Sequence, residues 1–177
     1  MTRAPENSLS TERLELVPVT AAHVEFLHRL WTDPDVRRFL WDDRVIGRDE
    51  AAAVVEASLD SFRRDGFGMW LVVLERAPIG FCGLRRFGQP PVDVEILYGL
   101  LPPHWGRGLA TEASRAVLEF AFRAGVSRVL AGADPPNGPS IRVMERLGMR
   151  CECTRTIDGR DATYFAIDAG SIGSPDR

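Results

Sequence analysis

The residues best suited to ligand chemistry gather where an apolar stretch passes into an amphipathic one. They are Trp105, Gly106, Arg107, Gly108, Leu109, Ala110 and Thr111. The two glycines let the backbone approach a ligand closely, and the first turn of the helix expected here leaves N–H groups without partners. These donors and the positive end of the helix dipole favour a phosphate or pyrophosphate, to which Arg107 adds charge. The segment predicts an anion site, with a plain strand-to-helix turn as the alternative.

Two other phosphate-binding motifs are excluded by single residues. A Walker loop needs a lysine, and all 22 basic residues of this chain are arginines. A dinucleotide fingerprint needs a third glycine three positions after Gly108, where the chain has Thr111. The absence of lysine also excludes a Schiff base and a lysine general base.

Four segments resemble motifs of the GNAT acyltransferases, and more narrowly of their RimJ/RimL-type branch. Residues 105–113 (W-G-R-G-L-A-T-E-A) resemble the acetyl-CoA pyrophosphate loop, with Gly108 and Ala110 at signature positions. Residues 137–149 resemble N-x-x-S followed by E-K-L-G-F, with Arg146 for lysine and Met149 for phenylalanine. Residues 32–36 and 95–100 resemble two further motifs. The four occur in the family's order, and the resemblance covers residues 12 to about 168.

This resemblance implies a cofactor and its contacts. The implied acyl donor is acetyl-CoA, whose pantetheine arm pairs with the end of strand 95–101 where it splays from strand 128–133. The pyrophosphate lies on the amides of residues 106–111. The backbone N–H near Leu100 polarises the thioester carbonyl, and Asn137 hydrogen-bonds the cofactor arm. The chain is therefore expected to acetylate a primary amine, which attacks directly in a ternary complex.

Two residues are candidates for proton transfer. The amine must be neutral before it attacks, and Glu95, on the strand that pairs with the cofactor, is the candidate base. A structural glutamate paired with an arginine is the alternative. Many family members have a tyrosine seven residues after the asparagine, but Met144 stands there and cannot donate a proton. Ser140 is the remaining hydroxyl near the departing thiolate, although a serine in the first turn of a helix often serves only as a cap.

The acceptor is the least determined part of the prediction. In the resembled family the first helical hairpin lines the acceptor cleft, and here it carries aromatic and acidic residues: Trp31, Phe39, Trp41, Asp42 and Asp43. Trp41 and Asp42 are the candidate substrate-binding residues, and such a lining suits a cationic amine. The alternative is a core role for the aromatic residues and a helix-approach role for the aspartates. A protein N-terminal α-amine is favoured as acceptor, and a small amine or amino sugar comes next. A non-catalytic acyl-CoA-binding module is the hypothesis from another class.

The periodicity of apolar residues predicts the elements that position these residues. It indicates strands over residues 12–19, 69–74, 79–84, 92–101, 128–131, 151–157 and 162–167. It indicates helices over 21–31, 48–64 and 108–124, and one beginning at Asn137. Asp33-Pro34-Asp35 breaks the first helix before a short turn, and the last two strands form a hairpin around Asp158-Gly159. The order predicts a mixed α/β domain. With the resemblance, this becomes a GNAT fold of six or seven mostly antiparallel strands with a splayed parallel pair, flanked by about four helices.

Composition limits the remaining classes of protein. With 177 residues, the chain is expected to form one domain over residues 11–168, between flexible segments 1–10 and 169–177. The net charge of −3 gives no basic field for nucleic acid or an anionic membrane. No apolar run approaches the length of a membrane span, and residues 1–10 lack the apolar core expected of a signal peptide. The expected location is the cytoplasm, and the expected assembly is a monomer or homodimer.

The cysteines do not predict a disulfide framework or a metal site. The chain has three, Cys82, Cys151 and Cys153, which is too few for a disulfide-stapled domain. Cys82 lies in an expected core strand and is interpreted as a small buried hydrophobe rather than as an acyl-carrying nucleophile. Cys151 and Cys153 with His104 fall short of a four-ligand zinc site, so no metal is expected.

Overall fold

A computed structural model describes residues 7–87, 93–157 and 160–171. Over these residues it forms one eight-stranded sheet with the spatial order β1-β2-β3-β4-β5-β6-β8-β7. The strands are β1 (Leu9–Ser10), β2 (Leu14–Pro18), β3 (Met69–Leu74), β4 (Ala77–Phe87), β5 (Asp93–Leu100), β6 (Arg128–Ala133), β7 (Arg150–Ile157) and β8 (Arg160–Asp168). Neighbouring strands are antiparallel except β5 and β6, which are parallel.

The sheet confirms the predicted mixed architecture with one parallel pair, but it has one strand more than expected. The additional strand is β1, in which Leu9 pairs with Leu16 of β2. A two-residue strand is too short to show an alternating pattern in the sequence. The structure also extends β4 to Phe87 and β6 to Ala133, beyond their predicted ends. The predicted turn at residues 158–159 lies outside the described residues, while β7 and β8 on either side of it pair as expected.

The described residues form five α-helices and two short 3-10 helices. They are η1 (Ala21–His23), α1 (Val24–Thr32), α2 (Pro34–Leu40), α3 (Arg48–Asp65), η2 (Pro102–His104), α4 (Leu109–Arg123) and α5 (Gly138–Arg146). The prediction of a turn in place of α2 was wrong. The Asp33 carboxylate accepts hydrogen bonds from the backbone N–H groups of Asp35 and Val36, and Pro34 takes the first helical position. The residues that end α1 therefore also begin the next helix.

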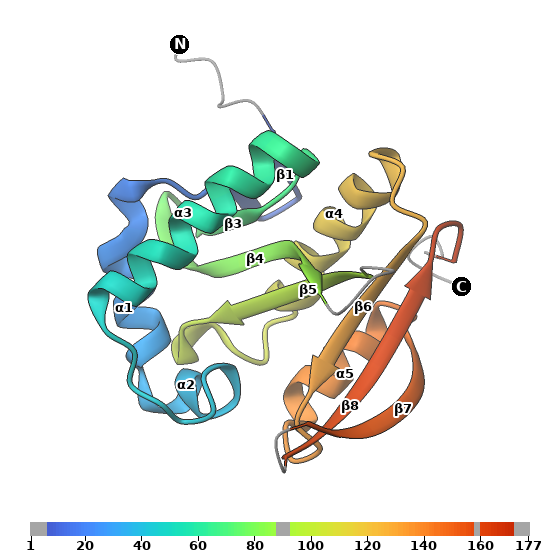
Figure 1. The fold of residues 1–177 in the computed structure, drawn as a ribbon. Coiled ribbons are helices and arrows are strands. Elements are labelled where there is room, and N and C mark those ends of the chain that lie inside the picture. The colour runs from blue at the N-terminus through green and yellow to red at the C-terminus, as the bar shows by residue number, and fades with distance from the viewer. Residues whose placement is uncertain (1–6, 88–92, 158–159, 172–177) are drawn as a thin grey trace.

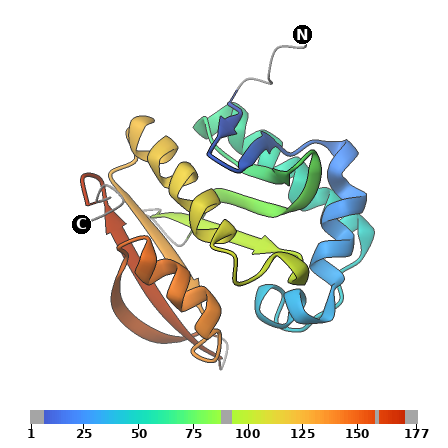
Figure 2. The ribbon, with the colours of Figure 1, turned by 180° about the vertical axis from the view of Figure 1, so that it is seen from behind.

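The helices cover the two faces of the sheet separately. Helices α4 and α5 pack on one face, in a core that contains Trp70 and Leu118. Helices α1, α2 and α3 pack on the other face, around Trp31 and Phe81. Figure 1 shows α1–α3 in front of the sheet, and Figure 2 shows α4 and α5 from behind. Burial of these large apolar side chains supplies the main driving force for folding.

The parallel pair at the centre of the sheet is short. Strands β5 and β6 are paired only at Val94–Val129 and Glu95–Leu130. Beyond these pairs β5 continues to Leu100 and β6 to Ala133, and the two strands diverge (Figure 1). The splayed pair predicted from the sequence is thus confirmed. Past Glu95, the backbone N–H and C=O groups on the facing edges of β5 and β6 do not pair with each other. The sheet therefore has a gap at this point, and polar backbone groups line both of its edges.

Candidate active site

The loop between β5 and α4 holds two glycines in a left-handed conformation. Gly106 and Gly108 have φ angles of 71° and 76°, in a region that costs other residues about 1–2 kcal/mol. A Cβ at Gly106 would meet no atom within 4 Å, so that glycine serves the backbone conformation rather than the available space. Gly108 is the N-cap of α4, where no described side chain caps the helix. The first N–H groups of α4 therefore stay available to an anion.

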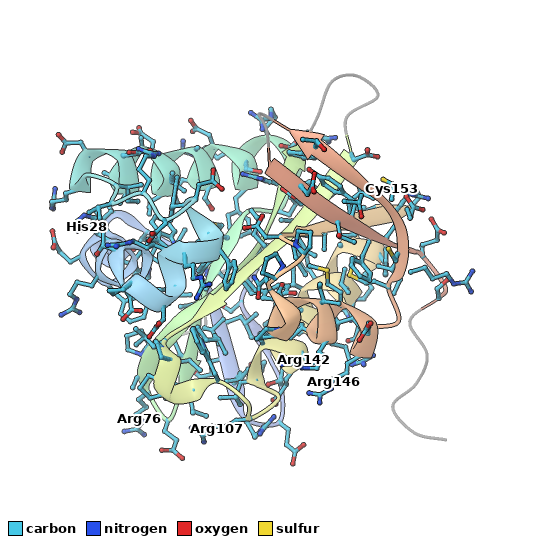
Figure 3. All side chains as sticks on the ribbon, turned by 90° about the horizontal axis from the view of Figure 1, so that it is seen from below. His28, Arg76, Arg107, Arg142, Arg146 and Cys153 are labelled. Carbon is cyan, nitrogen blue, oxygen red and sulfur yellow. The ribbon has the colours of Figure 1, made fainter. Side chains whose placement is uncertain are left out.

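The other predicted loop residues divide into a buried group and an exposed group. Leu109 is buried in the core beneath α4 and Ala110 packs partly against it, so these two can offer a ligand only their backbone N–H groups. Arg107 lies at the edge of the molecule (Figure 3), where its Nη1 approaches His104 Nδ1 at 3.3 Å. Its guanidinium can still add positive charge beside the loop.

Thr111 carries a buried hydroxyl in the first turn of α4. Its Oγ1 atom is buried and has no hydrogen-bond partner among the described residues. A buried hydroxyl left without a partner costs about 1–3 kcal/mol. A water molecule or a bound ligand can supply the missing partner.

Glu112 holds this first turn in place from the neighbouring residue. Its Oε1 accepts hydrogen bonds from the Thr11 hydroxyl at 2.6 Å and the Arg13 N–H at 3.0 Å, and its Oε2 accepts from Arg13 Nε at 2.7 Å. Arg13 Nη1 also donates to the backbone oxygen of Arg107 at 3.1 Å. Burial alone would raise the pKa of Glu112, but these donors outweigh it and the pKa is lowered. No local sequence pattern predicts this contact, because 99 residues separate Arg13 from Glu112.

Leu100 places backbone groups on the open edge of β5. The Leu101 N–H donates to Ile79 O on β4 at 2.8 Å, so by the alternation of a strand the Leu100 N–H points the other way, toward β6. The Leu100 carbonyl accepts a hydrogen bond from Trp105 Nε1 at 2.7 Å. The half-exposed Trp105 side chain thus ties the glycine loop back to the end of β5.

Glu95 lies where β5 and β6 begin to diverge. It is 5% exposed, and its Oε2 accepts hydrogen bonds from Arg85 on β4, with Nε at 2.7 Å. Its Oε1 is directed toward β6, because a Cβ built on Gly132 would lie 3.6 Å from it. Burial raises the pKa of Glu95, and the Arg85 guanidinium offsets part of that effect. Both interpretations of this residue remain compatible with the geometry: it is paired with an arginine, and it has one carboxylate oxygen at the gap.

Ser140 and Asn137 meet at the start of α5, and a tyrosine that the sequence did not single out joins them. Asn137 Oδ1 accepts a hydrogen bond from the Ser140 N–H at 3.2 Å, which makes it the N-cap of α5. The Ser140 hydroxyl lies 2.9 Å from Tyr98 Oη, and Tyr98 also donates to the Ser140 carbonyl at 3.1 Å. Burial raises the pKa of Tyr98 above its ordinary value. Met144, at the position where many family members have a tyrosine, is 1% exposed and lies in the core.

The candidate base Glu95 and the Tyr98–Ser140 hydroxyl pair approach the gap from opposite faces of the sheet. Tyr98 packs with the core on the α4–α5 side. Leu97 packs on the α1–α3 side, and Glu95 shares that side because side chains two positions apart on a strand share a face. The arrangement can therefore place a base on one side of a bound group and a hydroxyl donor on the other.

The predicted acceptor residues lie at the end of α2. Trp41 packs edge-on against Trp31 with ring centroids 5.8 Å apart, and both indole Nε1 atoms are buried without a hydrogen-bond partner among the described residues. Asp42 and Asp43 follow in left-handed conformations, with φ of 55° and 61°. Asp43 accepts a hydrogen bond from Arg37 Nε at 2.9 Å, which reduces the acidic character of this segment. Trp41 thus packs against the core, as expected if its role is structural rather than in substrate binding.

The remaining candidates carry no catalytic chemistry. Cys82 is fully buried beside the Ser114 hydroxyl, with 3.7 Å between Sγ and Oγ, and burial raises the pKa of its thiol to about 12. It is therefore a poor nucleophile, as interpreted from the sequence. The described residues contain no group of three or more histidine, cysteine or carboxylate side chains arranged for a metal ion. Nor does any helix in that part of the chain have the length and apolarity needed to cross a membrane.

Comparison with known proteins agrees with this geometry. A family model described as an acetyltransferase (GNAT) domain matches residues 13–150. The FsC-acetyl coenzyme A-N(2)-transacetylase of Aspergillus fumigatus is 30% identical over 158 residues, which cover 84% of this chain and 67% of that protein. The uncharacterized N-acetyltransferase p20 of Bacillus licheniformis is 29% identical over 150 residues, covering 82% of this chain and 83% of that protein.

The solved structures include RimL, a ribosomal-protein alpha-N-acetyltransferase in complex with coenzyme A. It aligns with a TM-score of 0.80 at 19% identity and covers 93% of this chain and 99% of that chain. At that identity the likeness concerns the fold alone. The family match is more specific, since it spans both strands of the open gap and the glycine loop. Because that match runs through most of the sequence, this chain belongs to the GNAT family of acetyltransferases.

Proposed function

We propose that the protein transfers an acetyl group from acetyl-CoA to a primary amine, by direct attack in a ternary complex. The observation that carries the proposal is that the β5–β6 ladder ends after two residue pairs, beside the glycine loop that opens α4. An open strand edge offers partners to an arm that contains amides, and helix N–H groups offer donors to a pyrophosphate. Coenzyme A carries both groups in succession, and β5 runs directly into the loop.

The residues around the glycine loop and the open edge of β5 fit coenzyme A. The amides of residues 106–111 would hold the pyrophosphate, and the unpartnered Thr111 hydroxyl would gain an acceptor there. Trp105 would keep the loop against β5 through its bond to the Leu100 carbonyl. Asn137 would offer its amide nitrogen to the arm, because its oxygen already caps α5. The bound thioester supplies a carbonyl carbon that an amine can attack.

The chain's own groups supply the remaining chemistry. The Leu100 N–H on the open edge donates a hydrogen bond to the carbonyl oxygen as it gains negative charge. Glu95, with one oxygen at the gap, takes a proton from the attacking nitrogen directly or through water. The Ser140 hydroxyl donates a hydrogen bond to the departing sulfur, and Tyr98 Oη, 2.9 Å away, holds that hydroxyl when its single hydrogen turns from the Ser140 carbonyl to Ser140 Oγ.

For the acceptor we favour the N-terminal α-amine of a protein, and we place the chain in the RimJ/RimL-type branch. The W-G-R-G-L-A-T-E-A loop supports that branch, as does the fold shared with RimL, whose own name describes an alpha-N-protein acetyltransferase. A small amine is the second candidate. It is favoured by the 30% identity to a protein named as an N(2)-transacetylase.

Calorimetry with acetyl-CoA, ATP and NAD tests the donor, with Gly108→Glu as the control. Binding of acetyl-CoA alone, lost in the variant, supports the loop assignment, because a side chain and a negative charge at Gly108 would oppose the pyrophosphate. Release of free thiol in the presence of short peptides, polyamines or aminoglycosides then identifies the acceptor class. Equal binding of all three nucleotides would refute the acetyltransferase proposal.

A non-catalytic acyl-CoA-binding module is the rival function, and Glu95→Gln separates the two. In an enzyme this variant should lose most of its turnover and keep its affinity for acetyl-CoA. If the parent protein binds acetyl-CoA but turns over no amine from any of these classes, the binding module is the better assignment.

A further inference from the structure

Arg85 on β4 binds one oxygen of the Glu95 carboxylate and not the other. Its Nε and Nη2 atoms both lie near Oε2, at 2.7 and 2.6 Å. Arginine frequently binds a carboxylate through two parallel hydrogen bonds, one to each oxygen. Here the β4–β5 ladder sets Arg85 directly opposite Glu95, so the guanidinium holds Oε2 from the β4 side while Oε1 is directed toward β6.

An aromatic pair reaches across the sheet beside this ion pair. The Arg85 guanidinium lies over the ring of Phe87, 5.5 Å from its centroid. Phe87 stacks on Tyr164 of β8 with ring centroids 6.1 Å apart, although β5 and β6 lie between their strands. These contacts restrain the guanidinium next to a carboxylate that is almost fully buried.

Gly132 on β6 keeps the second oxygen of Glu95 accessible. The glycine is exposed, and a Cβ added to it would lie 3.6 Å from Glu95 Oε1 and 3.2 Å from the Tyr164 ring. A larger side chain at this position would therefore fill the space beside Oε1. Because Gly132 is past the last β5–β6 residue pair, this space adjoins the gap in which the thioester arm is proposed to bind.

A buried carboxylate can act as a base only while it is ionised. Burial raises the pKa of Glu95, and the contact with Arg85 offsets part of that effect. Further titratable side chains on this face of the neighbouring strands are Asp93, Arg128, Tyr164 and Asp168. Arg128 interacts with both of these aspartates, and a phenol is uncharged near neutral pH. Arg85 is thus the cation in direct contact with the carboxylate.

We propose that Arg85 is the positioning residue of the base: it holds Glu95 through Oε2 and thereby directs Oε1 past Gly132 to the acceptor nitrogen. The ion pair then belongs to the reaction site, and the guanidinium charge keeps the carboxylate ready to accept a proton. The inference rests on the proposed function, because Arg85 has this part only if Glu95 takes the proton from the attacking amine. It goes further by joining the two interpretations of Glu95, as a base and as an arginine-paired strand residue, into one.

The pH dependence of turnover tests this role, with acetyl-CoA and the same acceptor amine for every variant. In Arg85→Gln the acid limb of kcat/KM should move to higher pH by about one unit, because an opposite charge in contact lowers the pKa of a carboxyl group and solvent reduces the effect of a half-exposed arginine. Arg85→Lys keeps the charge but not the two bonds, so its limb should stay close to that of the wild type while kcat falls. The KM for acetyl-CoA should be the same in all three proteins.

The next residue on β4 supplies the matched control. Arg86 points to the other face of the sheet, where its Nε donates to the Asp65 carboxylate at 2.8 Å. The Arg85 and Arg86 side chains are 53% and 47% exposed, and the carboxylate partners are 7% and 5% exposed. Arg86→Gln therefore breaks a comparable ion pair, and it should leave kcat/KM and its acid limb as in the wild type. Thermal melting of each variant checks that it is folded.

NMR of the Glu95 carboxyl carbon gives a readout that needs no turnover. The signal is assigned by its absence from Glu95→Gln. Its titration midpoint should lie at higher pH in Arg85→Gln than in the wild type, by the same amount as the kinetic limb moves. The midpoint should be unchanged in Arg86→Gln.

The outcomes distinguish this inference from the proposed function. If the wild type turns over no amine, the proposed function is wrong and the role of Arg85 falls with it. If the wild type is active but Arg85→Gln keeps its pH profile, or Arg86→Gln changes the profile equally, the function stands and the inference is overturned. A carboxyl titration that moves in Arg85→Gln while the kinetic limb stays in place would also overturn it, because Glu95 would then not be the base.

Discussion

Replacement of Glu112 by glutamine should loosen the start of α4. The carboxylate accepts from Thr11, from the Arg13 backbone and from the Arg13 guanidinium. A glutamine keeps one oxygen, so it can still accept some of these hydrogen bonds. Its NH2 group takes the place of the second oxygen and therefore meets another donor instead of accepting from it. The change therefore removes the charge and reverses one hydrogen bond while it preserves the shape of the side chain.

The expected loss is modest and can be estimated from exposure. A hydrogen bond between charged groups contributes about 1.5–3 kcal/mol. The Arg13 side chain is 44% exposed and that of Glu112 17%, so solvent screens the ion pair, and we expect a net loss of about 1–2 kcal/mol. For a chain of this length, 1 kcal/mol shifts the melting temperature by about 2–4 °C. Glu112→Gln should therefore melt about 2–8 °C below the wild type at pH 7.

The stabilising effect of Glu112 should depend on pH in a direction that its pKa shift fixes. The pKa of Glu112 is lowered on folding from 4.5, so its stabilising effect is complete above that value and is lost as pH falls through the folded pKa. The difference in free energy of unfolding between wild type and variant should shrink in acid. The control is Glu119→Gln on the same helix, whose Arg123 partner is 4.0 Å away. A Glu112→Gln protein that melts with the wild type at pH 7, or a difference that stays constant into acid, would refute this reasoning.

Three further predictions concern single side chains. If Glu95 is the base, kcat/KM should fall as pH decreases through a pKa above its ordinary 4.5, and Glu95→Gln should lack that limb. Tyr98→Phe should lower kcat several-fold with KM for acetyl-CoA unchanged, because Ser140 keeps its place but loses the donor that orients its hydroxyl; a change in KM alone would contradict this. In the folded protein a thiol reagent should modify the exposed Cys151 quickly and Cys82 only after unfolding, and rapid modification of Cys82 would contradict its burial.

The fold and the conformation of the glycine loop were predictable because both are encoded locally. The two glycines, the amphipathic run after them and the apolar strands carry their pattern within a few residues, and the loop lies where it was predicted. Helix α2 was missed because Asp33-Pro34 was interpreted only as a break. The same pair is also a good helix start, with a capping carboxylate and a proline at the first position.

The contacts that position the candidate site were not predictable, because they depend on register and on distant packing. Arg85 pairs with Glu95 because the β4–β5 hairpin sets those residues opposite one another, and the five residues between the two strands are outside the described part of the chain. Tyr98 meets Ser140 across 42 positions. A strand pattern gives the face on which Tyr98 lies, but it does not say which helix will cover that face.

The two-pair junction between β5 and β6 also divides the sheet mechanically. On one side are β1 to β5, and on the other are β6, β8 and β7, held to the rest chiefly by the core under α4 and α5. Such an arrangement can open locally at a cost below that of global unfolding, which amide hydrogen exchange would detect in β6 and β8. A ligand that spans both edges stabilises the closed state by about 2.7 kcal/mol at a concentration of 100 Kd. Acetyl-CoA would then connect β5 and β6 by hydrogen bonds as well as supply the acetyl group. The departure of coenzyme A after each turnover would return β6, β8 and β7 to the state that opens more readily.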